Sequence, residues 1–160
     1  MDAELPIDPD LVGDASAPSS THRPGHADRR RLRSGVLAAI GVGGFIGTVA
    51  RYEVGLSWPV RAGTFPASTF AINTSGAFAI GVVLTLILGS AVPHRLGRPL
   101  LVVGLLGGWT TMSTLATETS VLVKGGRPGT ALANSGATLV AGTVATLVGR
   151  QAAIVTSGGR

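Results

Sequence analysis

The distribution of carboxylates is the feature that most constrains the fold of this chain. Six of the eight acidic residues lie before residue 34, so only Glu53 and Glu118 remain in the rest of the 160 residues. A soluble domain of that size needs many more charged side chains to cover its surface. The chain is also 45% hydrophobic and 13% charged, with a mean hydropathy of +0.44. The part that follows residue 33 is therefore predicted to lie in a membrane.

Four apolar stretches follow, and each is close to the length of about 20 residues that crosses a bilayer as a helix. The predicted fold is an all-α membrane protein with four transmembrane helices. Four short helices enclose a polar pathway poorly, so an oligomer is expected. The predicted organisation is a tail over 1–33, a four-helix membrane domain over 34–150 and a C-terminal tail over 151–160. The four spans are expected at about 34–54, 67–91, 100–123 and 130–148.

The N-terminal segment 1–33 combines acidic residues with proline, serine and alanine, a composition typical of a disordered tail. It ends in a basic run, Arg29–Arg33, whose four arginines supply most of the net charge of +5. Such a run could bind nucleic acid, but its position directly before an apolar span indicates the cytoplasmic flank of a membrane helix. A twin-arginine export signal is a weaker interpretation, because the apolar segment is too long and three more spans follow it.

The basic residues also predict the orientation. With four spans, the tails and the loop 92–99 share one side of the membrane and carry Arg23, Arg29, Arg30, Arg31, Arg33, Arg95, Arg98, Arg150 and Arg160. The other side carries Arg51, Arg61, Lys124 and Arg127. The positive-inside rule therefore predicts that both termini are cytoplasmic. Without the tail the two sides would carry equal numbers, so the tail decides the orientation.

The third span contains an unusual polar stretch at its middle. Gly107-Gly108 is followed by four hydroxyl residues among Thr110–Thr114, all within an apolar run. One interpretation is a break in the helix at Gly107-Gly108, since discontinuous membrane helices turn free backbone groups toward ions. The other is that small residues allow close helix packing. The residue types alone leave both open.

Other polar residues lie within or beside the spans. Asn73 must bond either a neighbouring helix or a permeating species. Arg51 is either a vestibule cation or an ordinary interfacial arginine beside Tyr52. Thr111, Thr114 and Glu118 share one helical stripe, and an intramembrane carboxylate is a functional candidate by default.

Three motifs on successive spans resemble those of the CrcB/Fluc fluoride-channel family. Gly43–Tyr52 looks like its GGxxGAxxRY signature. Ile72–Gly81 resembles its VNxxGSFxxG segment, and Gly104–Glu118 resembles its GxxGGxTTFSTFxxE segment. The resemblance covers most of residues 35–149 and favours the break in the third span.

The resemblance implies a channel made of two four-helix subunits in antiparallel orientation. Fluoride enters acidified bacteria as HF, dissociates at cytoplasmic pH and is trapped, and the channel lets the anion leak out. A structural sodium ion (Na+) would be held by the backbone carbonyls of Gly107 and Thr110, which suits a hard cation. The matching fluoride pathway residues are Asn73, Ser113, Thr114 and Glu118, with Arg51 at the vestibule.

The chain departs from the family pattern where two phenylalanines, whose ring edges are electropositive, are expected. Met112 and Leu115 take these places in the pathway. Either the anion takes a different path, or a homologous second subunit supplies the rings. A tail that fixes one orientation favours an oppositely oriented partner, so a heterodimer stands beside the antiparallel homodimer, which would need dual topology.

Two other functions compete with a complete fluoride channel. An accessory or one-half subunit of a heteromeric channel fits Met112 and Leu115. A small multidrug exporter is also four-helical, but it needs a carboxylate deep in the first span, where only Glu53 stands at the end. An enzyme is not expected, because the chain lacks cysteine and shows neither a carboxylate pair nor a nucleophile beside a base.

Overall fold

The computed structural model describes residues 26–89 and 95–158, with side chains from residue 33 onward. The predicted N-terminal tail lies outside these residues except for its last part. Every regular element in the described part is helical: α1 His26–Ser57, α2 Ala67–Gly89, η2 Arg98–Leu106, α3 Gly107–Trp109, α4 Met112–Lys124 and α5 Pro128–Thr156.

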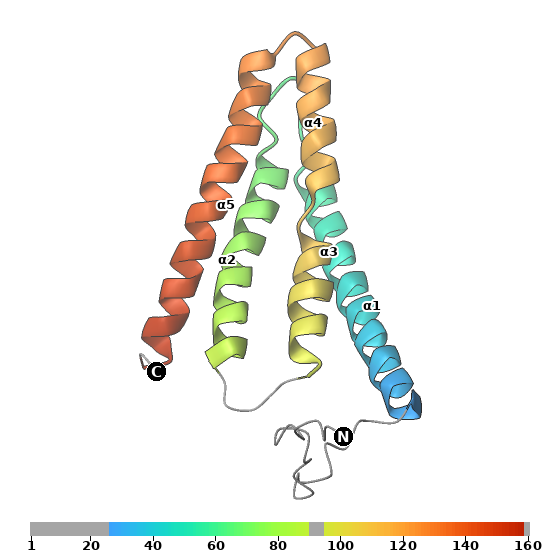
Figure 1. Cartoon of the computed structure of the whole chain (residues 1–160). Helices are drawn as coiled ribbons and strands as arrows, with labels where there is room; N and C mark the ends of the chain where they lie inside the picture. The colour runs from blue at the N-terminus through green and yellow to red at the C-terminus, as the bar shows by residue number, and fades with distance from the viewer. Residues whose placement is uncertain (1–25, 90–94, 159–160) are drawn as a thin grey trace, which may run out of the picture.

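The described helices form four segments that are long and apolar enough to cross a membrane. These are Arg33–Ser57, Ala67–Gly89, Arg98–Lys124 and Pro128–Thr156. The N-terminal end of α1 and the C-terminal end of α5 lie at one end of the bundle (Figure 1). The α1–α2 and α4–α5 connections lie at the opposite end, as expected for four antiparallel crossings.

The first and last helices extend beyond the predicted spans. α1 begins at His26, so residues 26–33, which were predicted to be part of the tail, are helical. α5 continues to Thr156, so most of the predicted C-terminal tail is helix. Pro24-Gly25 precedes α1, and Gly158, whose φ is +74°, follows α5. Gly149, directly after the predicted end of the last span, remains helical within α5, where a Cβ would collide with the Phe78 carbonyl.

α1 packs against the first half of the third span through glycines on both helices. A Cβ on Gly104 would lie 2.7 Å from the Ile40 carbonyl oxygen and 3.0 Å from the Gly43 Cα. A Cβ on Gly43 or Gly47 would collide with backbone carbonyls of Leu100 or Leu105. The Gly43/Gly47 pair therefore allows the close helix approach that its four-residue spacing predicts.

A second glycine contact joins α2 to α5. A Cβ on Gly81 would collide with the Thr146 carbonyl, and one on Gly149 with the Phe78 carbonyl. The Thr146 hydroxyl donates across the same contact to the Ala77 carbonyl at 3.2 Å. The bundle thus contains two closely packed helix pairs, α1 with η2 and α3, and α2 with α5.

The contact between α1 and η2 predicts different effects of substitution at two glycines of the same helix. Gly43→Ala should lower the stability of the folded protein by about 1–3 kcal/mol, because the new methyl group meets backbone that cannot rotate away. Gly41→Ala is the matched control, since a Cβ there meets nothing within 4 Å. Thermal unfolding of the purified proteins in detergent, followed by circular dichroism, measures both. Equal melting temperatures for the two variants would contradict the packing described here.

Candidate functional site at the interrupted third span

The third span is interrupted between α3 and α4. Thr110 (φ −77°, ψ 156°) and Thr111 (φ −146°, ψ 120°) have extended backbone. Gly107 and Gly108, where the sequence predicted the break, are helical. A Cβ on Gly108 would lie 2.6 Å from the Gly44 carbonyl oxygen, so this glycine serves close packing against α1. The predicted position of the break at Gly107-Gly108 is therefore wrong, since the extended backbone begins at Thr110. For Gly108, close helix packing is the correct interpretation.

Asn73 of α2 holds the backbone of the interruption. Its Nδ2 donates to the Thr111 carbonyl at 3.0 Å, and its Oδ1 accepts from the Thr111 amide at 2.8 Å. Both polar groups of one extended peptide are thereby satisfied at membrane depth, where an unpaired group is costly. Of the two roles that the sequence left open for Asn73, the structure shows the bond to a neighbouring segment.

Thr111 also caps the helix that follows. Its Oγ1 accepts from the Thr114 amide at 3.1 Å and donates to the Thr114 hydroxyl at 3.0 Å. The Ser113 hydroxyl lies 3.2 Å from the same oxygen. This side-chain cap is the usual way to begin a helix after extended backbone, and it gathers three hydroxyls at the start of α4.

The interruption frees backbone carbonyls from their helical donors. The Thr111 amide bonds Asn73 in place of the Gly107 carbonyl, and the Thr114 amide bonds Thr111 Oγ1 in place of the Thr110 carbonyl. The Gly108 carbonyl is satisfied differently, because Arg51 Nε donates to it at 3.0 Å. Arg51 is thus bonded to the interrupted third span, close to where the sequence places Tyr52.

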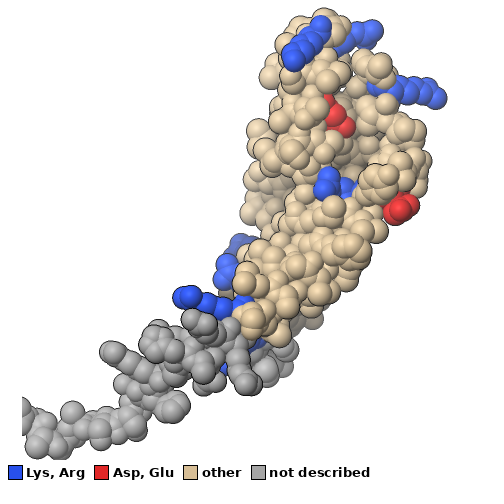
Figure 2. All heavy atoms as spheres, turned by 90° about the vertical axis from the view of Figure 1, so that its right-hand side faces the viewer, with Lys and Arg blue, Asp and Glu red and all other residues tan. Residues whose placement is uncertain are grey.

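A cavity of about 460 Å³ lies between α1, α2 and α4. Its lining includes Arg51, Thr69, Thr111, Thr114 and Glu118. The Thr69 hydroxyl donates to Glu118 Oε1 at 2.8 Å, while the buried Oε2 has no partner among the described residues. Figure 2 shows an acidic and a basic group set into a hollow on this side of the molecule. We call this space the inner vestibule.

A second cavity, of about 330 Å³, lies on the other side of the interruption. Asn73, Thr110, Met112 and Leu115 line it, and Thr111 lines both this cavity and the inner vestibule. Leu115 is buried at 5% exposure, whereas Met112 is 72% exposed. The two cavities therefore meet at the extended peptide, with polar groups of α1, α2 and α4 on one side and of α2 and α5 on the other.

Most of the predicted site residues come together here. Arg51, Thr114 and Glu118 line the vestibule, and Asn73, Thr110, Met112 and Leu115 line the second cavity. Gly107 and Ser113 line neither of these cavities and are exposed on the surface of the single chain.

Sequence reasoning missed Thr69 and gave no role to Asn134 and Thr138. Asn134 is fully buried, with its Nδ2 donating to Thr119 Oγ1 at 3.2 Å and its Oδ1 unpartnered among the described atoms. The buried Thr138 hydroxyl also lacks a partner there, and it lines the second cavity. The available signal was four-residue spacing, which places Thr69 one turn before Asn73 and Asn134 one turn before Thr138.

Within the described residues, no group of three His, Asp or Glu side chains is placed to hold a metal ion. Any cation bound at the interruption would therefore depend on backbone carbonyls and hydroxyls.

Comparison with known proteins identifies the family. The family described as "CrcB-like protein, Camphor Resistance (CrcB)" matches residues 38–150. The chain is 46% identical over 121 residues to fluoride-specific ion channel FluC 3 of Streptomyces avermitilis, covering 76% of this chain and 59% of that protein. It is 44% identical over 130 residues to FluC 2 of the same organism, covering 76% and 82%. It is 40% identical over 122 residues to FluC 2 of Nocardia farcinica, covering 76% and 87%. Because the family match takes in most of all four spans and the interruption between α3 and α4, this chain belongs to the CrcB family.

Proposed function

We propose that this chain is a subunit of a fluoride-specific ion channel in the bacterial cell (inner) membrane, where it passively exports fluoride and so limits its toxicity. The observation that carries the proposal is the pair of cavities, each lined in part by polar side chains, that meet at the extended Thr110–Thr111 backbone. Relatives that share 40–46% of their aligned residues with this chain are named fluoride-specific ion channels. No energy source is needed, because HF that dissociates in the cytoplasm leaves fluoride with an outward gradient.

The chemistry around the interruption suits a small, strongly hydrated anion. The hydroxyls of Ser113 and Thr114 can donate in place of water, whereas the Thr111 hydroxyl already donates to Thr114. The start of α4 also carries the positive end of the helix dipole, and the amides of Met112 and Ser113 have no partner among the described residues. An anion that passes this point would replace part of its hydration shell with protein donors.

The functional unit is proposed to be an antiparallel dimer. The single chain leaves polar residues of the third span exposed at membrane depth, where lipid cannot satisfy them. Gly107, Met112 and Ser113 are exposed on this face, together with Thr117 and Ser120 of α4. A second subunit that covers the face would bury these groups and complete the walls of the second cavity.

A structural Na+ at the centre of that dimer is part of the proposal. The carbonyls of Gly107 and Thr110 both lack their usual helical donors, and carbonyl oxygens are ligands that hard cations accept. The donor set thus fits the ion. When bound, Na+ would offset the partial negative charge of these carbonyl oxygens, and it would take no part in a reaction.

The identity of the second subunit depends on Met112 and Leu115. Neither side chain presents an electropositive ring edge to the anion. We therefore propose a heterodimer with a homologous subunit that supplies phenylalanines as the alternative to a homodimer. The excess of basic residues at the end that holds both termini supports one fixed orientation, with those termini in the cytoplasm, and so favours the heterodimer.

Fluoride efflux from liposomes tests the function directly. Purified protein reconstituted alone should release fluoride and retain chloride if the homodimer conducts. Release only after co-reconstitution with a homologue that carries the two phenylalanines would assign the chain to a heteromeric channel. Absence of fluoride release in both preparations, with protein shown to be folded by circular dichroism, would exclude the proposed function.

Asn73→Ala should abolish fluoride release and destabilise the protein. The substitution leaves the Thr111 amide and carbonyl unpaired, at a cost of about 1–3 kcal/mol for each group. Thr85→Ala in the same helix is the control, because the Thr85 hydroxyl bonds only the Gly81 carbonyl of its own helix. Release by the Asn73 variant at the rate of the control would show that the clamp on the interruption is dispensable.

The effect of Na+ on the stability of the folded protein tests the proposed sodium site separately. Thermal unfolding in detergent should shift to higher temperature when Na+ replaces a large organic cation at constant ionic strength, since binding to the folded state alone stabilises it. Thr110→Pro removes the amide of Thr110 and disturbs the bond to the Leu106 carbonyl, and should abolish the shift. A sodium shift of the same size in this variant would argue against a site at the interruption.

A further inference from the structure

We propose that Arg61, in the loop between α1 and α2, forms the outer mouth of the pathway and draws small anions toward the inner vestibule. This inference rests on the proposed channel function and adds to it a residue outside the membrane helices. Three observations support it: the hydrogen bonds and turn that fix the loop, a third cavity beneath the loop, and the charged residues around that cavity.

The loop holds Arg61 at a defined position. The Thr64 amide and hydroxyl both donate to the Arg61 carbonyl, at 3.2 and 2.8 Å. Gly63 takes a positive φ of 75°, which closes the turn. Beyond the turn, the Phe65 ring packs edge-on against Phe70 of α2, with 5.5 Å between ring centroids. The backbone that carries the guanidinium is therefore fixed relative to α2.

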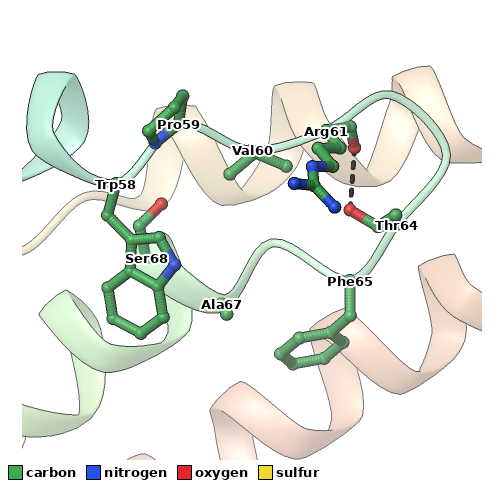
Figure 3. A pocket seen from close by; sticks show the side chains of 8 residues that line it. All are labelled: Trp58, Pro59, Val60, Arg61, Thr64, Phe65, Ala67 and Ser68. Carbon is green, nitrogen blue, oxygen red and sulfur yellow. Dashed lines mark hydrogen bonds between the residues drawn. The ribbon is translucent and has the colours of Figure 1, made fainter.

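A cavity of about 470 Å³ lies beneath this loop, and we call it the outer cavity. Figure 3 shows the Arg61 side chain folded under the loop, between Val60 and Thr64. Pro59, Val60 and Ser68 line both the outer cavity and the inner vestibule. Ser68 is only 4% exposed. Because it lines both cavities, it lies at the boundary between them. The three cavities thus follow one another from the loop to the interruption.

The charges along this route explain why a cation is needed at the mouth. The inner vestibule contains the Glu118 carboxylate, which repels an approaching anion. Arg51, its neighbour in that cavity, already donates through Nε to the Gly108 carbonyl. Arg61 and Glu118 both line a smaller cavity of about 180 Å³, so the loop cation lies on the route past the carboxylate.

Arg61 is available for this role. Among the described residues, its guanidinium has no hydrogen-bond acceptor and no carboxylate partner. A second guanidinium reinforces it, because a Cβ placed on Gly63 would lie 3.8 Å from Arg127 Cζ. Arg61 at the rim of the outer cavity, with Arg127 beside the same loop, raises the local concentration of anions, and the effect falls as salt screens the charges.

Quenching of tryptophan fluorescence tests the inference without relying on conduction. Trp58 lines the outer cavity with Arg61 and is one of the two tryptophans of the chain. Iodide should quench the wild-type protein about two- to threefold more effectively than Arg61→Gln at low ionic strength, the effect expected for one charge several ångströms away in water. Acrylamide, which is neutral, should quench both proteins equally.

Two further variants separate charge from structure. Arg61→Lys keeps the charge and should behave like the wild type. Lys124→Gln removes one charge at the same end of the bundle from a residue that lines none of these cavities, and should leave iodide quenching unchanged. Iodide quenching of Arg61→Gln equal to that of the wild type, or an equal loss in Lys124→Gln, would overturn the inference.

Fluoride flux provides the second readout. Arg61→Gln should release fluoride two- to threefold more slowly than the wild type at about 10 mM salt, and at nearly the same rate at about 1 M, where the Debye length falls to about 3 Å. A loss of equal size at both salt concentrations would mean a structural defect and would count against the inference. If the wild type releases no fluoride either alone or with the homologue that carries the two phenylalanines, but iodide quenching still depends on Arg61, the channel proposal fails while the anion-attracting mouth stands.

Discussion

Two hydrogen bonds between the Asn73 side chain and the Thr111 backbone stabilise the interruption in the middle of the third membrane span. A helix in lipid satisfies its own backbone, and any interruption exposes groups that hydrocarbon cannot solvate. The amide side chain of Asn73 replaces the missing partners of one peptide, and the Thr111 hydroxyl replaces another at the start of α4. The carbonyls and hydroxyls that face the cavities are available because these two side chains stabilise the extended backbone between them.

The close packing of α1 supports the same arrangement. Gly104 and Gly108 let α1 approach until Arg51 reaches the Gly108 carbonyl. A larger residue at either glycine would move the arginine away from the interruption as well as loosen the helix pair. The packing of α1 and the bond from Arg51 to Gly108 therefore depend on each other. Gly104 and Gly108 contribute to the site in this way although neither lines the inner vestibule or the second cavity.

Hydropathy and the scarcity of carboxylates after residue 33 were sufficient to predict four membrane helices, because a bilayer allows few alternatives. Three motifs were sufficient to predict the family. The position of the interruption was not predictable from the glycine pair, because glycine serves equally for flexibility and for close packing. What decided between them was the tertiary contact of Gly108 with Gly44 and the bond from Asn73 to a residue 38 positions away. Thr69 and the α1–α2 loop escaped notice because only the fold places them beside Glu118.

The two glycine contacts divide the bundle into two bodies. One consists of α1 with η2 and α3, and the other contains α2 and α5, with α4 packed against α5. The extended Thr110–Thr111 segment joins them as a hinge, and Asn73 fastens it across the gap. A second bond joins the same two bodies, because the Trp109 indole of α3 donates to Ser75 Oγ of α2 at 3.1 Å. The separation of the two bodies, and with it the width of the route between the cavities, therefore depends on a few polar side chains of α2 rather than on a broad apolar interface.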